Sequence, residues 1–506
     1  MSALEIKADE GHIVEKENAP NGGNAYAVEV SFAKDDPLNP QEGWGALKRW
    51  RVLFVALFIT FTSTYNSAGN GSVGEGVEKE FGVSAEIFQV SSFAYQLMLG
   101  VGPLLLAPLS ETFGRRPMLV TVTALITLLF LPQALAPNFA SICATRFFQG
   151  IMGSVEGPVI AGLLADLFPK VKRGRAMGVF VVSVYAGNAC GPSISAWVAY
   201  KLSWRWVYWL QMIMSGCSCI LTFFFLPETR GELILSKRAN ALTEESGIQH
   251  YIRGAHKARS FIEGVKLSST RPLLYLFTEP IVTMCALWIG FAWGVTFLGF
   301  GATALVFSDV YGFNAGLKST PVLTGLIGAL FGFVENELIQ EPLYRCAVQR
   351  GGGRAQPEAR LYSSAAGALM FAVGFFGFAW TARPWIPWIA PAIFLTFSQF
   401  GLYMVYLATY NYLSDTYERY SSSAQAAQSL LRGFMGACFP FFGNKMYENL
   451  GYPYASTLVG GIGLIFVGVP LLMLRYGPAL RQRSKVAMEL SHLEGEVLRD
   501  EPVVVA

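Results

Sequence analysis

Long apolar stretches, each about the length of a membrane-spanning helix, recur along the whole chain and constrain its fold more than any other feature. Of the 506 residues, 53% are hydrophobic and only 14% are charged, whereas soluble domains carry roughly 25% charged residues. A helix needs about 20 apolar residues to cross the hydrocarbon core of a bilayer. Because many stretches reach that length, the sequence predicts an all-α polytopic membrane protein, with the lipid bilayer as its first expected partner.

The pattern predicts twelve membrane-spanning segments. They lie near residues 51–69, 86–109, 117–136, 140–164, 177–199, 206–227, 274–299, 319–341, 363–382, 386–411, 424–445 and 454–476. The predicted domains are a disordered cytoplasmic tail (1–48), an N-terminal six-helix half (49–227), a central cytoplasmic loop (228–272), a C-terminal six-helix half (273–477) and a cytoplasmic C-terminal tail (478–506).

Basic and nearly neutral loops alternate along the chain. Lys and Arg gather in "GRRP", "PKVKRGR", "RGELILSKRANA", "RCAVQRGGGRAQPEAR" and "RYGPALRQRSK", and they are nearly absent from "APNFAS", "SDVYGFNAG" and "ENLGYP". Because basic loops stay on the cytoplasmic side, we expect both termini inside the cell. The expected location is the plasma membrane. The sequon Asn70-Gly71-Ser72 would then face outside, which makes Asn70 a glycosylation candidate.

A short internal repeat supports two halves of six spans. The sequence "LLADLF" is followed by "NACGPSIS", and later "YLSDTY" is followed by "GACFPFFG". Asp166 and Pro192 are 26 positions apart (192 − 166), and Asp415 and Pro440 are 25 apart (440 − 415). Related six-helix halves with a substrate site between them are one known transporter architecture.

Several motifs, in this order, resemble the major facilitator superfamily and most of all its fungal twelve-span drug:proton antiporter branch. They are "DPLNPQEGW", "APLSETFGRRP", "RFFQG", "GNACGPSIS", "WRWVYW", "LPETR", "TEPIV" and "PEARL". The resemblance implies a major facilitator fold of twelve helices in two pseudo-symmetric halves, alternating access and proton-coupled export. Two motifs depart from the family pattern: Ala107 replaces a usual glycine at the end of span 2, and Ser195 and Ala196 replace a glycine pair in span 5.

A compact charged cluster joins spans 2 and 3. Gly114 suits a tight turn, and the guanidinium groups of Arg115 and Arg116 can pair with carboxylates. The resemblance implies that these residues and Glu111 form a conformational latch on the cytoplasmic side, with Asp166 or the N-terminal end of span 11 as the partner. The alternative is a basic anchor that only fixes the topology.

Three charged residues inside predicted spans are candidates for proton coupling: Arg146, Glu156 and Glu335. Charges within a membrane are costly and usually face a partner or a cavity. The resemblance implies a coupling role for Arg146; the alternative is that it snorkels to the outer interface. The Glu156 carboxyl either exchanges protons among small residues or contacts loop arginines. Since Glu335 and Glu337 face different sides of span 8, at most one should face the cavity; the alternative is pairing with Arg345 or basic loop residues.

The remaining site predictions concern helix shape and substrate contacts. In span 5, Gly187, Gly191 and Pro192 should give a close helix contact and a kink that seal the inner leak path. The candidates for the substrate cavity are Tyr65, Gln149, Trp293, Tyr406 and Arg432.

These features predict a secondary transporter that exports a small organic molecule by proton antiport. The substrate would be a xenobiotic, a polyamine or a secreted metabolite such as an organic acid. We expect a functional monomer that needs no cofactor besides the proton gradient and binds neither metal nor nucleic acid. No enzymatic constellation stands out, because all four histidines fall in predicted tails or loops. The alternatives are an importer of a small nutrient and a non-transporting sensor; the short C-terminal tail argues against the sensor.

Overall fold

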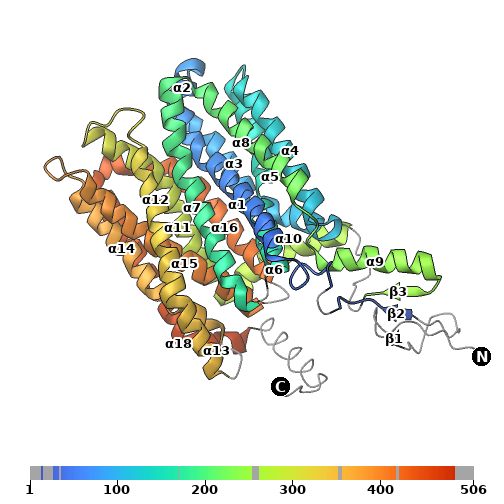
Figure 1. Ribbon diagram of the computed structural model, residues 1–506. Helices are drawn as coiled ribbons and strands as arrows, with labels where there is room; N and C mark the ends of the chain where they lie inside the picture. The colour runs from blue at the N-terminus through green and yellow to red at the C-terminus, as the bar shows by residue number, and fades with distance from the viewer. Residues whose placement is uncertain are drawn as a thin grey trace, which may run out of the picture.

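Long helices run side by side through the molecule (Figure 1). The computed structural model describes residues 13–14, 27–33, 36–168, 170–252, 261–351, 356–417 and 421–484. Helix α2 (Gly74–Phe81) lies at one end of the bundle, and α9 (Gly231–Ser246) lies beyond the opposite end. We call these the α2 end and the α9 end.

The N-terminal half contains six spans. They are α1 (Ala46–Ala68), α3 (Ala85–Phe113), α4 (Arg115–Ala134), the pair α5 (Phe139–Gly153) and α6 (Glu156–Leu167), α7 (Lys170–Lys201) and α8 (Trp204–Phe225). A 3₁₀ turn, η1 (Gly69–Val73), and then α2 connect α1 to α3 at the α2 end.

The C-terminal half also contains six spans. They are α11 (Pro280–Asp309), α12 (Thr324–Glu335) with α13 (Glu341–Arg350), α14 (Ser364–Thr381), α15 (Ile389–Tyr417), α16 (Ser421–Leu450), and α17 (Tyr452–Phe466) with α18 (Gly468–Arg483). A π-helical turn, η3 (Asn336–Gln340), joins α12 to α13, and the 3₁₀ turns η2 (Thr320–Leu323) and η4 (Pro357–Leu361) precede α12 and α14.

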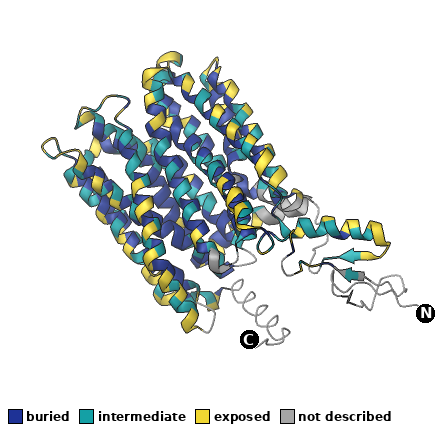
Figure 2. Cartoon of the chain, in the orientation of Figure 1, coloured by how far each residue is buried: buried dark blue, intermediate teal, exposed yellow. Residues whose placement is uncertain are grey.

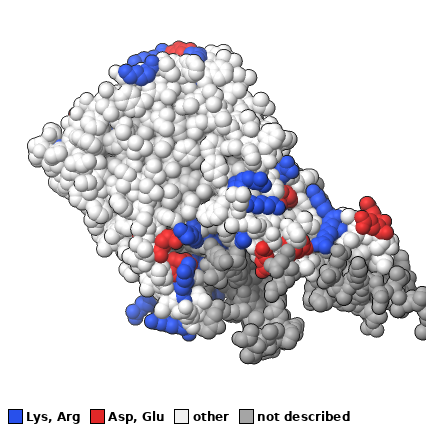
Figure 3. All heavy atoms as spheres, viewed as in Figure 1, with Lys and Arg blue, Asp and Glu red and all other residues white. Residues whose placement is uncertain are grey.

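The surface and the helix lengths fit a membrane-embedded bundle. Within the described residues, ten helical segments are long and apolar enough to cross a membrane. Helices α3 and α16, with 29 and 30 residues, complete the twelve expected spans. Figure 3 shows a broad face with almost no charged residues between charged groups near the two ends. The predicted all-α polytopic fold is therefore confirmed for the bundle.

Buried residues face the interior of the bundle, and exposed ones lie along its outside and at its ends (Figure 2). Exposed Phe54, Phe224 and Phe331 illustrate the outer apolar surface. Small residues let helices approach closely inside. A Cβ atom on Gly433 would lie only 2.6 Å from the Cα of Gly100, so this glycine pair brings α3 and α16, one from each half, into backbone contact.

The N-terminal segment differs from the disordered tail that the sequence predicts. Strands β1 (Ile13–Val14) and β2 (Ala27–Glu29) join β3 (Gln249–Tyr251) of the central segment in the order β1-β2-β3, with β1 and β2 antiparallel and β2 and β3 parallel. Asp36 accepts a hydrogen bond from Arg238 of α9 at 2.6 Å. Residues 13–14 and 27–29 are therefore ordered here, and the long-range partners of β2 and Asp36, more than 200 positions away, leave no signal in the local sequence.

The central segment also contains more helix than expected. Helix α10 (Phe261–Thr278) continues past the predicted end of the loop at residue 272, and the seventh span begins at Pro280. Proline has no N–H to donate and disfavours helical geometry in the preceding residue. Glu279 accordingly breaks the helix with φ −106° and ψ 99°.

Candidate functional site

A small cavity lies between the two halves near the middle of the bundle. Its volume is about 70 Å³. Helices of both halves line it with hydroxyl-bearing residues (Thr60, Ser63, Thr64, Ser67, Ser154, Ser429), apolar side chains and the predicted cavity residues Trp293, Tyr406 and Arg432. Three of the five residues predicted for the substrate cavity therefore lie together.

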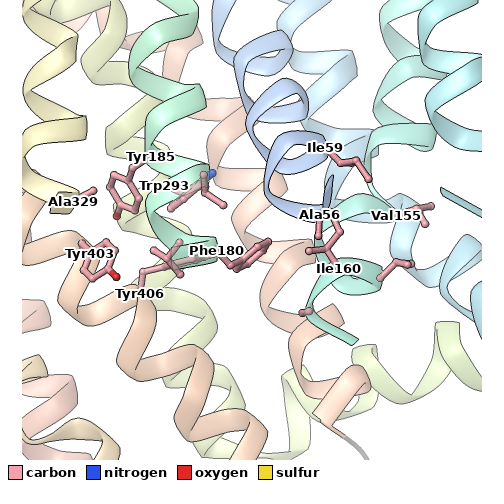
Figure 4. Packing of buried hydrophobic residues seen from close by; sticks show 14 of the residues in the cluster. Ala56, Ile59, Val155, Ile160, Phe180, Tyr185, Trp293, Ala329, Tyr403 and Tyr406 are labelled. Carbon is pink, nitrogen blue, oxygen red and sulfur yellow. The ribbon is translucent and has the colours of Figure 1, made fainter. Parts of the chain in front are cut away.

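Aromatic rings form one wall of this central cavity. The rings of Trp293 and Tyr406 are stacked, with centroids 5.0 Å apart and 26° between their planes. Tyr185 of α7 meets Trp293 edge-on at 6.2 Å. Figure 4 shows Tyr185, Trp293, Tyr403 and Tyr406 gathered where α7 of the N-terminal half faces the C-terminal half. Trp293 and Tyr406 line the cavity itself, and Tyr185 of the N-terminal half packs against Trp293.

Arg432 of α16 brings a positive charge to the same wall. Its Nη1 donates a hydrogen bond to the Tyr406 hydroxyl at 2.8 Å, and its guanidinium carbon lies 5.3 Å from the Trp293 ring centroid. A guanidinium over an aromatic face is attracted by the ring quadrupole. Tyr406 and Trp293 thus hold the charge at the edge of the cavity.

Two residues predicted for the substrate cavity lie elsewhere. Tyr65 is fully buried between α1 and α7, where its hydroxyl accepts a 3.4 Å hydrogen bond from Ser195. Gln149 accepts a hydrogen bond from Gln133 at 2.9 Å and lines only a very small pocket inside the N-terminal half. Helix rotation decides which face of a span turns inward, and the apolar sequences around these two residues do not indicate it.

A larger cavity of about 500 Å³ lies between the halves toward the α2 end. Ser67 and Phe297 line both this cavity and the central one. Two ion pairs join the halves nearby: Lys318 with Glu75, and Lys445 with Glu86 at 3.3 Å. The central cavity therefore continues toward the α2 end.

The halves are in tight contact toward the α9 end. The Tyr403 hydroxyl of α15 donates to the carbonyl of Gly178 in α7 at 2.9 Å. Arg175 pairs with Glu337 at 3.5 Å. A Cβ on Gly174 would lie 2.8 Å from a carboxylate oxygen of Glu341. The α9-end part of α7 is thus pressed against the C-terminal half, and the passage is closed on this side.

The predicted latch residues are assembled at the α9 end. The Nε of Arg115 lies 3.4 Å from the carboxylate of Asp166, one of the two partners expected for it. Gly114 has φ 99° and ψ 165° and forms the turn between α3 and α4. Arg116 donates to the carbonyl of Phe223. The side chain of Glu111 lies outside the described residues.

Glu228 is a latch residue that the sequence analysis missed as a site. Its carboxylate accepts the backbone N–H groups of Arg115 at 3.0 Å and Arg116 at 3.2 Å. It also accepts those of Thr229 and Arg230 at 3.0 Å. A carboxylate at the start of α4 satisfies unpaired helix N–H groups and the helix dipole. The only signal for it was the motif "LPETR".

A matching charged cluster lies in the C-terminal half. Buried Arg360 pairs with Asp415 at 2.9 Å and with Glu341 at 3.5 Å. Glu358 receives two hydrogen bonds from Arg481, at 2.9 and 2.8 Å. The available signals in the sequence were the motif "PEARL" and the internal repeat, which matches Asp415 with Asp166. In the C-terminal half, Asp415 thus has an arginine partner as Asp166 does in the N-terminal half.

Arg146 is buried inside the N-terminal half. The structure places its side chain 1% exposed, so it does not snorkel to the interface. Its Nη1 donates to the carbonyl of Asn66 at 3.2 Å, and its guanidinium lies 4.1 Å from the ring centroid of Tyr95. Tyr95 also lines the central cavity. Arg146 is therefore linked to the cavity through Tyr95.

Of the two acidic candidates for proton coupling, the structure describes the side chain of only Glu335. The Glu156 side chain lies outside the described residues. Glu335 ends α12 next to the π-helical turn and interacts with the Ser363 hydroxyl within the C-terminal half. Its neighbour Glu337 contacts the other half through Arg175. Neither Glu335 nor Glu337 lines the central cavity.

The span 5 glycines pack where the motif predicts. A Cβ on Gly187 would lie 2.0 Å from the Thr64 hydroxyl oxygen of α1, and one on Gly191 would lie 2.8 Å from the Tyr65 carbonyl. Pro192 lies within α7 and lines the larger cavity. The glycines thus make the close contact with α1, and Pro192 lies on the α2 side of the molecule; the sealing role stays a prediction.

The glycosylation prediction for Asn70 is corrected by its burial. Asn70 is 1% exposed. Its amide donates to the hydroxyls of Ser91 and Ser92 at 3.2 and 3.0 Å, and its oxygen accepts from Tyr208 at 3.0 Å. The 3₁₀ turn η1 folds this residue into the bundle, so no glycan can be attached without breaking these contacts.

Comparisons with known proteins agree with this architecture. The family model described as Major Facilitator Superfamily matches residues 53–440. The efflux pump FUBT of Fusarium oxysporum is 33% identical over 488 residues, which is 94% of this chain and 81% of that protein. The multidrug transporter mdrA of Aspergillus fumigatus is 33% identical, covering 92% of this chain and 77% of that protein.

A solved structure shows the same fold. The crystal structure of the human organic anion transporter MFSD10 (TETRAN) matches with a TM-score of 0.57 and 16% identity, covering 83% of this chain and 99% of that chain. At this identity the likeness concerns the fold alone.

Proposed function

The chain belongs to the major facilitator superfamily, and we propose that it is a secondary transporter that exports a small organic molecule from the cytosol by proton antiport. The observation that carries the proposal is the pair of cavities between two six-helix halves, closed at the α9 end and enlarged toward the α2 end. Binding between two halves is the arrangement that alternating access requires. The naming of full-length relatives as efflux pumps supports the outward direction.

In this proposal the α9 end faces the cytosol and the protein lies in the plasma membrane. The supporting observation is the basic character of the segments at the α9 end, since such segments are retained inside. The present conformation would then release substrate to the outside. The proposal includes a functional monomer, which the formation of both cavities within one chain supports, and coupling to the proton gradient.

Arg146, Glu156 and Glu335 are the candidates for the coupling route. Arg146 is supported by its burial and by its contact with Tyr95, a residue of the central cavity. A buried guanidinium with no acidic partner among the described residues is costly unless it serves function. The proposal includes no catalytic step.

The decisive experiment measures direction and energy source together. Purified protein is reconstituted into vesicles, and sided vesicles are selected by the accessibility of a tag on the N-terminal segment. A fluorescent xenobiotic should accumulate in inside-out vesicles when the lumen is acidic, and accumulation should collapse with a protonophore. Proton-driven uptake into right-side-out vesicles instead would indicate an importer and would contradict the proposal.

A further inference from the structure

The part of the central cavity that the structure describes contains a positive charge with no negative one beside it. Among the described residues that line it, Arg432 is the only charged side chain. None of the ion pairs formed by described residues includes Arg432. The cations at the two ends behave differently: Arg115, Arg360 and Lys318 each have a carboxylate partner.

The guanidinium is fixed without being neutralised. Among the described residues, it donates a hydrogen bond to the Tyr406 hydroxyl at 2.8 Å and lies over the face of Trp293. Trp293 and Tyr406 are themselves stacked, so the group is held by rigid rings. Arginine offers five N–H donors in a planar fork that matches a carboxylate. Most of that fork remains available to a ligand.

We propose that the central cavity binds organic anions, with Arg432 as the residue that recognises the carboxylate of the substrate. This inference rests on the proposed transport function and specifies its substrate class. The surrounding wall suits the rest of such a molecule: Phe180, Val184 and Phe297 offer apolar contact, and hydroxyls of α1 offer hydrogen bonds. A polyamine would meet a cation here, and none of the described lining side chains is an acid that could bind it.

The route out of the site follows the shared residues. The central cavity of about 70 Å³ holds only the head of a ligand, since pockets for drug-sized molecules measure about 300–1,000 Å³. Ser67 and Phe297 connect it to the cavity of about 500 Å³ toward the α2 end. The carboxylate of the ligand therefore sits at Arg432, and its apolar body extends past Phe297 into the larger cavity toward the α2 end.

The test compares matched probes on the full-length protein in detergent. The probes are 2-naphthoate, its neutral counterpart 2-naphthamide, and the cation 2-naphthylmethylammonium, with binding followed by calorimetry. The acid should bind at least about tenfold more tightly than the amide, which corresponds to about 1.4 kcal/mol, and the cation should bind most weakly. Equal affinities for acid and amide would overturn the proposal.

Variants assign the preference to Arg432. Arg432→Gln should abolish the preference for the acid and leave the affinity for the amide within about twofold, while Arg432→Lys should keep part of it because the charge remains. Arg350→Gln is the matched control, since Arg350 is exposed at the end of α13. A preference for the acid that survives in Arg432→Gln would refute the assignment, as would an equal loss of both ligands, which indicates a packing role.

Failure of this inference is distinguishable from failure of the proposed function. The binding measurement needs no gradient and no direction. Anion binding that depends on Arg432, in a protein that vesicle assays show to be an importer, would leave the inference standing and remove the export proposal. Proton-driven export of 2-naphthylmethylammonium that is unaffected by Arg432→Gln would do the reverse.

Discussion

At the scale of single residues, Gly114 fixes the geometry of the latch. Its dihedral angles, φ 99° and ψ 165°, fall in a region that only glycine adopts readily. A Cβ there would also lie 2.4 Å from a carboxylate oxygen of Glu228. Gly114→Ala should therefore combine backbone strain with displacement of the group that caps α4, costing about 1–3 kcal/mol.

The measurement for Gly114→Ala is the apparent unfolding midpoint in detergent, together with the export rate. Gly82→Ala is the control, because Gly82 also has a positive φ of 64° but a Cβ there would meet nothing within 4 Å. We expect the Gly114 variant to be the less stable of the two and to lose export. Equal effects would show that backbone strain alone matters and that Glu228 does not hold the latch.

Arg146 gives a second prediction at this scale. Its guanidinium both donates to the Asn66 carbonyl and lies on the Tyr95 ring, a combination that a lysine ammonium cannot reproduce in one geometry. We expect Arg146→Ala and Arg146→Lys each to lower proton-driven transport at least about tenfold, as removal of a group that acts in coupling would.

Membrane insertion and yield separate a coupling defect from a folding defect in the Arg146 variants. Both variants should reach the membrane in amounts similar to the parent, and calorimetry with 2-naphthoate should still detect binding, since Arg146 does not line the central cavity. Normal proton-driven transport in Arg146→Lys would remove this residue from the coupling route.

At the scale of helices, the contact of α1 with α7 depends on missing side chains. A Cβ on Gly187 would meet Thr64 Oγ1 at 2.0 Å and the backbone oxygen of Phe61 at 2.4 Å. A rotamer change moves the hydroxyl but not the backbone, so Gly187→Ala must push the helices apart. Overpacking of this kind costs about 1–3 kcal/mol, and we expect a lower unfolding midpoint and slower transport.

The control for the α1–α7 contact is Gly216→Ala in α8. A Cβ at Gly216 would meet only Thr127, at 3.7 Å, which is ordinary contact. Because alanine favours helix more than glycine does, this variant should be neutral or slightly more stable. A Gly187→Ala variant as stable as Gly216→Ala would contradict the packing that the structure shows.

The helices also show how far the sequence alone could lead. Spans, order and the two halves follow from local composition, so they were predictable. The ion pair of Arg115 with Asp166 was predictable too, because the motif marks Arg115 and the repeat marks Asp166. Helix rotation within the bundle decides that Asn70 is buried. It also decides that Arg432 lines the central cavity and Tyr65 does not. The pairing of β2 with β3 and the caps made by Glu228 depend on distant contacts, which local patterns do not record.

At the scale of the whole molecule, contacts between the halves at the α9 end and at the α2 end favour opposite conformations. The α9 end is closed by the buried hydrogen bond from Tyr403 to Gly178, whereas the α2 end is joined by more exposed ion pairs such as Lys445 with Glu86. Exposed pairs contribute about 0.2–1 kcal/mol, and a buried hydrogen bond contributes about 0.5–1.5 kcal/mol. The balance between the end states therefore rests on few contacts, and Tyr403→Phe should shift it toward opening at the α9 end.

This shift can be followed by the reactivity of a thiol in the larger cavity. Ala304→Cys places one there in a background whose seven native cysteines are replaced by serine. A membrane-impermeant maleimide added on the outside should label it more slowly when Tyr403→Phe is also present, by up to about fivefold for a loss of about 1 kcal/mol. Tyr362→Phe, at a 45% exposed tyrosine, should leave the rate unchanged. Unaltered labelling in the Tyr403 variant would mean that this bond does not set the conformational balance, and that the closure of the α9 end rests on the contacts of Gly174 and Arg175 instead.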